Sequence, residues 1–138
     1  MTRPIRLLIV DDEARLVETL SKRLTARGLY VEGVHSGADA LALLQGKPFD
    51  VALLDVRMPG MDGLTTLREI KKLQPLLQVI MLSGNASINA AVEGMRLGAS
   101  EYLLKPANID DVLAKIEEAF HKKLIQEERL AAQPGPGA

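Results

Sequence analysis

The sequence contains no cysteine and no tryptophan, and it has only two phenylalanines and two tyrosines. Without cysteine there can be no disulfide, no thiolate metal site and no thiol catalysis, which fits a reducing compartment. With so few aromatic side chains, a hydrophobic core must be built from aliphatic residues. We therefore expect an aliphatic-core protein that resides in the cytoplasm.

The sequence also lacks long apolar runs and an excess of either charge. No stretch approaches the roughly 18 consecutive apolar residues that a membrane-spanning helix needs. The apolar run at residues 7–10 is too short for a secretory signal, and acidic residues follow it at once. The formal net charge of −1 provides no basic surface for nucleic acid or anionic lipid. We expect no membrane association and no direct binding of nucleic acid by this chain.

Five short apolar runs alternate with segments of helical periodicity. At 138 residues, with 47% hydrophobic and 25% charged residues, the chain has the size and balance of one soluble globular domain. The predicted strands are residues 5–10, 30–34, 51–54, 79–82 and 102–104. A helix is predicted after each strand: the second begins after Ser36, the third covers about 64–72, the fourth about 87–97, and the last begins at Asn108 or Ile109. This alternation predicts an α/β fold in which helices cover both faces of a parallel sheet.

Polar side chains follow four of the five predicted strands. In a parallel sheet flanked by helices, function gathers at the carboxyl ends of the strands. The polar residues at these ends are Asp11, Asp12, Glu13, Asp55, Ser83 and Lys105. Each alone has an ordinary explanation, because an acid can cap the following helix and a serine or lysine can simply end a strand. Together, on one rim of the sheet, they predict a functional site.

Three aspartates, Asp11, Asp12 and Asp55, would lie within a few ångströms of one another at this rim. Two carboxylates about 4 Å apart repel each other by roughly 4 kcal/mol at an effective dielectric constant near 20, so protons or a cation must share the site. A set of oxygen ligands without histidine or cysteine selects Mg²⁺. A carboxylate beside such an ion can attack phosphorus and form an acyl phosphate. Lys105 and Ser83 would then supply a positive charge and a hydroxyl donor to the phosphoryl oxygens.

Four segments of the chain carry a resemblance to a known family. They read LIVDDE at residues 8–13, LLDVRMPGMDG at 53–63, IMLSG at 80–84 and ASEYLLKP at 99–106. In this order and spacing they resemble the receiver domains of two-component response regulators, over roughly residues 4–122. The resemblance implies a (βα)5 flavodoxin-like fold, which is a doubly wound five-stranded parallel sheet with strand order 2-1-3-4-5.

The resemblance also implies a role for each residue that would hold the metal ion and the phosphoryl group. Asp55 is the implied phosphoacceptor and one of the Mg²⁺ ligands. Asp12 is implied as a direct ligand and Asp11 as a ligand that acts partly through water. The backbone carbonyl of Arg57 is the remaining implied ligand, and Arg57 and Asn85 are expected to tune the lifetime of the phosphorylated form.

Ser83, Lys105 and Tyr102 carry the implied response to phosphorylation. Ser83 resembles the family's switch hydroxyl and Lys105 its phosphate-binding lysine. Tyr102 resembles the aromatic switch residue, which would fill the space that Ser83 leaves, although its pattern alone is more typical of the core. The peptide bond between Lys105 and Pro106 is expected to be cis, at a cost of about 0.5–1 kcal/mol. Residues 58–60 would form the turn that leaves the site.

The implied function is that of a signalling module and not of an enzyme acting on other molecules. A sensor histidine kinase or a phosphotransfer protein would donate the phosphoryl group to Asp55, and the chain would assist its own phosphorylation and dephosphorylation. The change would reach a downstream partner, or a homodimer formed through the fourth helix, fifth strand and fifth helix. Two alternatives stay open: an interaction module with this fold that needs no phosphorylation, and a flavodoxin-like cofactor binder. The acids after the first strand disfavour the cofactor binder, because they repel phosphate.

The end of the chain is expected to be separate from the receiver domain. We predict a receiver domain at residues 1–122 and, at residues 123–138, a helix extension followed by a flexible tail rich in proline and glycine. The helical pattern continues past Phe120 through Leu124. This continuation favours a solvated helix end, with the start of a coiled coil or linker as the alternative. No residues are left for an output domain, so we expect either a stand-alone receiver or a fragment of a longer regulator.

Overall fold

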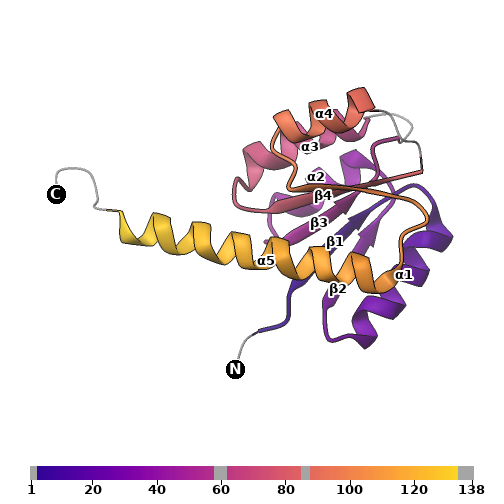
Figure 1. Cartoon of the computed structure of the whole chain (residues 1–138), viewed down its shortest axis with the longest axis horizontal. Helices are drawn as coiled ribbons and strands as arrows, with labels where there is room; N and C mark the ends of the chain where they lie inside the picture. Colours follow the sequence, from indigo (N-terminus) through magenta and orange to yellow (C-terminus); the bar gives the residue numbers. More distant parts are fainter. Residues whose placement is uncertain (1–2, 58–61, 85–87, 134–138) are drawn as a thin grey trace.

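The computed structural model describes residues 3–57, 62–84 and 88–133, and shows strands alternating with helices (Figure 1). The strands are β1 (Arg6–Val10), β2 (Tyr30–Val34), β3 (Val51–Leu54), β4 (Gln78–Ser83) and β5 (Glu101–Leu104). The helices are α1 (Ala14–Ala26), α2 (Gly37–Leu44), α3 (Gly63–Leu73), α4 (Ile88–Arg96) and α5 (Ile109–Ala132). Neighbouring strands pair in parallel in the order β2-β1-β3-β4-β5. The predicted α/β fold and its strand order are confirmed.

The strands contribute to two hydrophobic cores, one on each face of the sheet. On one face, Leu8 and Val10 of β1 pack with residues of α2 and α3. On the other face, Leu7 and Ile9 pack with residues of α1 and α5. Successive side chains of a strand point to opposite faces, so a strand that is covered on both sides is a continuous apolar run. Figure 1 shows the same layers, with α1 and α5 on one side of the sheet and α3 and α4 on the other.

Polar side chains mark where three of the helices begin. Oγ of Ser36 accepts a hydrogen bond from the N–H of Asp39 at 3.0 Å, at the start of α2. The side chain of Asn108 accepts one from the N–H of Asp110 at 2.8 Å, at the start of α5. Ser36 was expected to precede the second helix and Asn108 or Ile109 to begin the last one, and such caps satisfy N–H groups that have no partner inside the helix. Asp62 caps α3 in the same way, although this cap was not predicted.

The bounds of β1, β4 and β5 differ from the predicted ones by single residues, whereas those of β2 and β3 match them. β4 begins at Gln78 and includes Ser83, which is one residue more at each end, and β1 begins at Arg6 instead of Ile5. Backbone pairing sets these boundaries, whereas the prediction used hydropathy. Gln78 has a polar side chain, but its backbone is in register with that of Val51. The pairing therefore extends beyond the apolar run.

Of the helices described, α5 is the longest. Its 24 residues correspond to about 36 Å at the usual rise of a helix, and Figure 1 shows its C-terminal part projecting beyond the sheet. The first half is buried through Val112, Ile116 and Phe120, the face that the sequence predicted. The helix then continues without interruption past residue 122 to Ala132. A division of the chain at residue 122 stays a prediction.

Some predictions fall outside the described residues. These are the turn at residues 58–60, Asn85, residue 87 as the start of the fourth helix, and the flexible tail at 134–138. Within the described part of the chain, no helix combines the length and the apolar character that crossing a bilayer would require.

Candidate functional site

The pairing of β1 with β3 brings three aspartates together. Val10 is in register with Leu54, and the N–H of Asp55 donates to the carbonyl of Val10 at 2.9 Å, so Asp11 and Asp55 follow their strands side by side. One carboxylate oxygen from each of Asp11, Asp12 and Asp55 lies within 4.8 Å of the others. Asp11 and Asp55 are buried, while Asp12 is exposed. The predicted acidic cluster is therefore formed, in an arrangement that could hold a metal ion.

Backbone N–H groups orient two of these carboxylates. The N–H of Glu13 donates to Oδ1 of Asp11 at 2.9 Å, and the N–H of Arg57 donates to Oδ1 of Asp55 at 3.1 Å. In both cases the aspartate accepts from the N–H two residues further along the chain, which is the pattern of an Asx turn. The second oxygen of each aspartate, Oδ2, then lies on the side of Lys105.

Gly63 allows α3 to begin directly against the backbone of this site. A Cβ atom at this position would lie 2.4 Å from the carbonyl oxygen of Asp55 and 2.5 Å from Cα of Val56. The N–H of Gly63 donates to the carbonyl of Val56 at 2.9 Å, which holds the two segments at this short distance. Backbone atoms cannot turn aside as a flexible side chain can, so glycine is required here. This requirement could not be predicted from the sequence, because it depends on the packing of α3.

Asp55 has little compensation for its negative charge. Burial raises the pKa of its carboxyl group, and the charges of Asp11 and Asp12 raise it further. The N–H of Arg57 and the ammonium group of Lys105 act in the opposite direction, but the net shift of the pKa is upward. The site is therefore short of positive charge, a condition that a bound cation would relieve.

The ammonium group of Lys105 lies among three acids. Its Nζ is 2.7 Å from Oδ2 of Asp11, 2.8 Å from Oε1 of Glu13 and 3.6 Å from Oδ2 of Asp55. Burial opposes the charge of Lys105, but the hydrogen bonds to Asp11 and Glu13 and the nearby charges outweigh it and raise the pKa of the lysine. Its peptide bond to Pro106 is cis, as predicted. Lys105 was predicted at the site, but its pairing with Glu13 was not.

One cleft of about 280 Å³ is lined by the side chains that were predicted to take part in phosphoryl transfer. The lining residues are Asp12, Glu13, Asp55, Arg57, Ser83, Gly84 and Lys105. Ser83 is the last residue of β4 and is buried. Its carbonyl accepts a hydrogen bond from the N–H of Lys105 at 2.8 Å, which joins the ends of β4 and β5. The cleft therefore brings carboxylates, a hydroxyl group and an ammonium group to one place.

Tyr102 lies on β5, outside the set of residues that line the cleft. It is partly buried and packs against the core on the α2 and α3 side of the sheet. In the parallel register it pairs with Met81, two residues before Ser83. Tyr102 is thus connected to the site through the pairing of β4 with β5.

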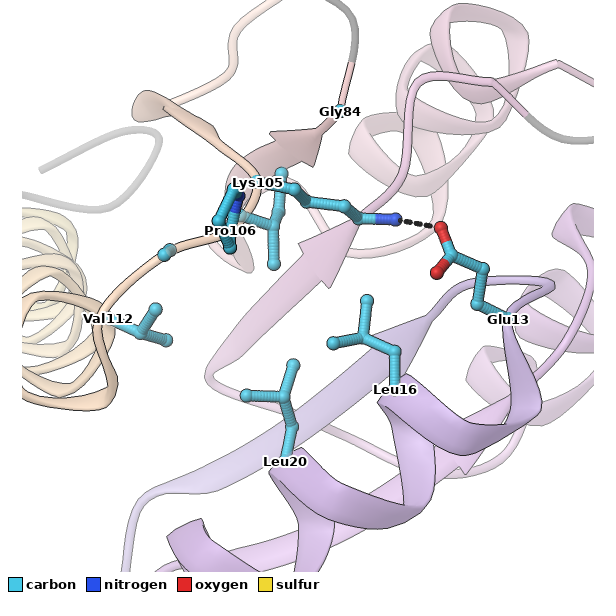
Figure 2. Close-up of a pocket in the computed structure, with 9 residues that line it drawn as sticks. Glu13, Leu16, Leu20, Gly84, Lys105, Pro106 and Val112 are labelled. Atoms are coloured by element: carbon cyan, nitrogen blue, oxygen red, sulfur yellow. Dashed lines mark hydrogen bonds and ion pairs between the residues drawn. The ribbon is translucent and has the colours of Figure 1, made fainter.

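A second, apolar cavity of about 410 Å³ lies beside the cleft, between α1 and the start of α5 (Figure 2). Its lining residues are Glu13, Leu16, Leu20, Leu82, Gly84, Lys105, Pro106, Ala107 and Val112. Figure 2 shows the side chain of Lys105 extended toward Glu13, with Leu16 and Leu20 below the ion pair. Both charged residues also line the acidic cleft, so their ion pair forms a boundary between the two cavities. This cavity was not predicted, because segments far apart in the chain enclose it.

Comparison with known proteins gives a match over most of the chain. The family model described as the response regulator receiver domain matches residues 7–117. The DNA-binding transcriptional regulator NtrC of Escherichia coli (strain K12) is 39% identical over 129 residues, which are 93% of this chain and 28% of NtrC. The chain therefore spans little more than a quarter of the length of this relative.

Two solved structures are similar at the level of the whole fold. The CheY-like response regulator receiver domain protein from Methanospirillum hungatei JF-1 has a TM-score of 0.86 and 32% identity, and the match covers 89% of this chain and 98% of that one. A response regulator from Burkholderia pseudomallei, with a phosphorylated aspartic acid, a calcium ion and citrate, has a TM-score of 0.79 and 31% identity, covering 94% and 75% of the two chains. With the family model, these likenesses show that the chain belongs to the response regulator receiver domains of two-component systems.

Proposed function

We propose that this receiver domain accepts a phosphoryl group on Asp55 from a histidine kinase or a phosphotransfer protein, with Mg²⁺ bound, and then changes its conformation. The observation that carries the proposal is the cleft in which Asp55, Lys105 and Ser83 meet, beside the other two aspartates of the cluster. The similar Burkholderia protein adds support, since its structure contains a phosphorylated aspartic acid and a calcium ion.

The donor set of the acidic cluster fits a hard divalent cation. Three carboxylates supply oxygen ligands within 4.8 Å of one another, and neither histidine nor cysteine is among them. We assign Asp11, Asp12, Asp55 and the backbone carbonyl of Arg57 as the protein groups that would hold Mg²⁺. When bound, the ion would offset the negative charge of the cluster and polarise the phosphoryl oxygens. The upward shift in the pKa of Asp55 supports this assignment, because burial and, to a lesser extent, the charges of Asp11 and Asp12 disfavour the carboxylate, and a cation would offset both.

The transfer itself is a direct displacement at phosphorus. An oxygen of the Asp55 carboxylate forms a bond to phosphorus while the bond from phosphorus to the imidazole nitrogen of the donor breaks, and the electron pair of that bond stays on nitrogen. No separate base is needed, because an ionised carboxylate is already a nucleophile. Lys105 and Ser83 donate hydrogen bonds to the phosphoryl oxygens as negative charge develops there. Attack of water on phosphorus later releases phosphate and restores Asp55.

Phosphorylation supplies the driving force for a conformational change. It adds roughly −1.5 to −2 charge and three acceptor oxygens next to Lys105 and Ser83. Both residues lie at the ends of paired strands, so their movement toward the phosphoryl group would shift the ends of β4 and β5 together. Tyr102, on β5, would follow that shift and alter the face formed by α4, β5 and α5. A local charge would thus bias an equilibrium between two conformations.

Intact mass spectrometry after incubation with acetyl phosphate and Mg²⁺ tests the phosphoacceptor directly. We expect the wild-type chain to gain the mass of one phosphoryl group and Asp55→Asn to gain none. Asp39→Asn is a matched control, because Asp39 is an exposed aspartate on α2, outside the cleft. Omitting Mg²⁺ or adding EDTA should abolish the gain in mass in both the wild type and Asp39→Asn.

Two results would overturn this function. If the wild-type chain gains no mass while it is folded, the alternative of an interaction module that needs no phosphorylation replaces it. If Asp55→Asn gains the same mass as the wild type, the acceptor is a different residue. A coloured purified protein would instead favour the alternative of a flavodoxin-like cofactor binder.

A further inference from the structure

The lysine of the site is held mainly by acids other than the proposed phosphoacceptor. Nζ of Lys105 lies at hydrogen-bond distance from Asp11 and Glu13, at 2.7 and 2.8 Å, but 3.6 Å from Asp55. An ammonium group has three N–H donors, and two of them are directed to these two acids. In this arrangement two of the three N–H donors of Lys105 are already occupied, although its ammonium group lies only 3.6 Å from Asp55.

Helix capping does not explain the side chain of Glu13. Glu13 stands at the N-cap position of α1, yet within the described residues its side chain makes no capping hydrogen bond to the helix. Its carboxylate instead reaches Lys105, a residue 92 positions away in the chain. Its backbone N–H donates to Asp11, the other acid that binds Lys105. Glu13 therefore contributes to both contacts that hold the lysine.

These contacts must compete with the phosphoryl group for the same ammonium. We propose that Glu13 is a positioning residue, which occupies an N–H donor of Lys105 in the unphosphorylated protein and so slows phosphorylation. This inference rests on the function proposed above, because it assumes that Lys105 binds the phosphoryl oxygens. The Glu13 side chain is 61% exposed, so its contact with Lys105 can break without burying a lone charge.

The exposure of Glu13 also limits the size of the expected effect. An ion pair with one exposed member contributes little, which corresponds to a change of about two- to fivefold in an equilibrium or a rate. We therefore expect Glu13→Gln to bind beryllofluoride, an unreactive mimic of an aspartyl phosphate, about two- to fivefold more tightly than wild type in the presence of Mg²⁺. The rate of labelling by acetyl phosphate should rise by a similar factor.

Two variants separate the contact with Lys105 from a simple change in charge. Glu13→Asp keeps the negative charge but shortens the side chain, so the contact is lost while the local charge remains. If Glu13 acts by holding Lys105, Glu13→Asp should increase the beryllofluoride affinity and the labelling rate as much as Glu13→Gln does. Glu18→Gln removes one negative charge from the exposed face of α1, where Glu18 pairs with Lys22, and should behave as wild type.

The measurements are beryllofluoride titrations followed by amide NMR shifts, and labelling rates followed by intact mass, on all four proteins. The inference is overturned if Glu13→Gln or Glu13→Asp shows the wild-type affinity for beryllofluoride and the wild-type labelling rate. It is also overturned if Glu18→Gln increases both as much as Glu13→Gln does. Failure of the wild type to bind beryllofluoride or to take label overturns the proposed function itself, which is a different result. Thermal melts of the four proteins would identify any variant whose change comes from altered folding.

Discussion

Keeping the carboxylate of Asp55 ionised destabilises the folded chain, because Asp55 is buried beside two further aspartates. Burial and these neighbours raise its pKa on folding, so the ionised form is less favourable in the folded chain than in the unfolded one. The resulting contribution to stability is fully present below the unfolded pKa and is lost as the pH rises through the raised value. At neutral pH we therefore expect Asp55→Asn to melt at a higher temperature than wild type in EDTA.

Mg²⁺ should reverse this order of stabilities by acting on the wild type. At about ten times its Kd, an ion that binds only the folded state adds about 1.4 kcal/mol, which corresponds to about 5 °C in the Tm of a chain of this size. Asp55→Asn lacks one of the proposed Mg²⁺ ligands, so Mg²⁺ should raise its Tm by less. Melts followed by circular dichroism, with Asp39→Asn as the control, measure both effects. A lower Tm for Asp55→Asn in EDTA would contradict the charge argument.

A single methyl group at position 63 should be enough to disturb the backbone of the site. In Gly63→Ala the new Cβ would meet backbone atoms of Asp55 and Val56 at 2.4 and 2.5 Å, so α3 or the end of β3 must move. We expect a loss of about 1–3 kcal/mol in the free energy of unfolding, the usual cost of overpacking, and slower labelling by acetyl phosphate. Gly46→Ala is the matched control, since nothing lies within 4 Å of a Cβ there. Urea unfolding should separate the two variants, and equal stabilities would show that α3 can shift without cost.

Among the elements, α5 is attached to the sheet by buried polar contacts as well as by its apolar face. Nζ of Lys123 donates to Oδ1 of Asp50 at 2.8 Å, and Asp50 also accepts hydrogen bonds from the guanidinium group of Arg3. Further along the helix, Gln126 accepts a hydrogen bond from Gln78 at 3.1 Å. Asp50 and Gln78 lie at the amino ends of β3 and β4, opposite the acidic cleft. These contacts set the direction in which α5 leaves the sheet.

Asp50 should make this attachment dependent on pH. Burial opposes its charge, but hydrogen bonds from Arg3, Lys123 and the N–H of Arg6 outweigh burial and hold the pKa of Asp50 well below its usual range. A carboxyl group of this kind contributes stability above the unfolded pKa near 3.9, and the contribution is lost as the pH falls below that value. We expect Asp50→Asn to lower the free energy of unfolding by about 3 kcal/mol at pH 7, because it leaves Lys123 buried without its partner.

Urea unfolding at two pH values tests this expectation. The difference between wild type and Asp50→Asn should be large at pH 7 and smaller near pH 3, where the wild type has lost part of the contribution of Asp50. Asp110→Asn is the control, because the side chain of Asp110 is 74% exposed in its ion pair, and such a pair contributes at most about 1 kcal/mol. A difference that grows toward low pH would show that the charge of Asp50 is not what stabilises the attachment.

The same element shows which parts of the structure the sequence could predict. The first half of α5 was predicted because Val112, Ile116 and Phe120 recur at helical spacing on the face that the core covers. A helix extension past residue 122 was expected, but as a solvated end. Its attachment through Lys123 and Gln126 was not predicted, since polar side chains of this kind usually indicate a surface. The acidic cluster could be predicted because strand order alone brings its members together. The contact of Glu13 with Lys105 could not, because it depends on the side-chain conformations of two residues 92 positions apart.

For the molecule as a whole, the remaining question is which surface transmits the phosphorylated state. Ile88, Val92 and Met95 are exposed and recur at helical spacing on α4, so they form one apolar stripe. Leu104, at the end of β5, is also exposed. An apolar stripe beside the strand that carries Tyr102 would be covered by a partner or by a second copy of the chain. A homodimer through α4, β5 and α5, the expected alternative to a separate downstream partner, would cover this stripe.

Sedimentation velocity with and without beryllofluoride and Mg²⁺ tests whether the switch reaches this surface. We expect the mimic to shift the chain from monomer toward dimer, and Val92→Glu to weaken the dimer by at least about tenfold, because the new charge would be buried without a partner. Leu73→Glu is the control, since Leu73 is an exposed leucine on α3, outside the stripe. Ser83→Ala combined with Tyr102→Phe should bind the mimic and still stay monomeric. If that double variant dimerises as wild type does, phosphorylation reaches the surface by a route that does not involve these two residues.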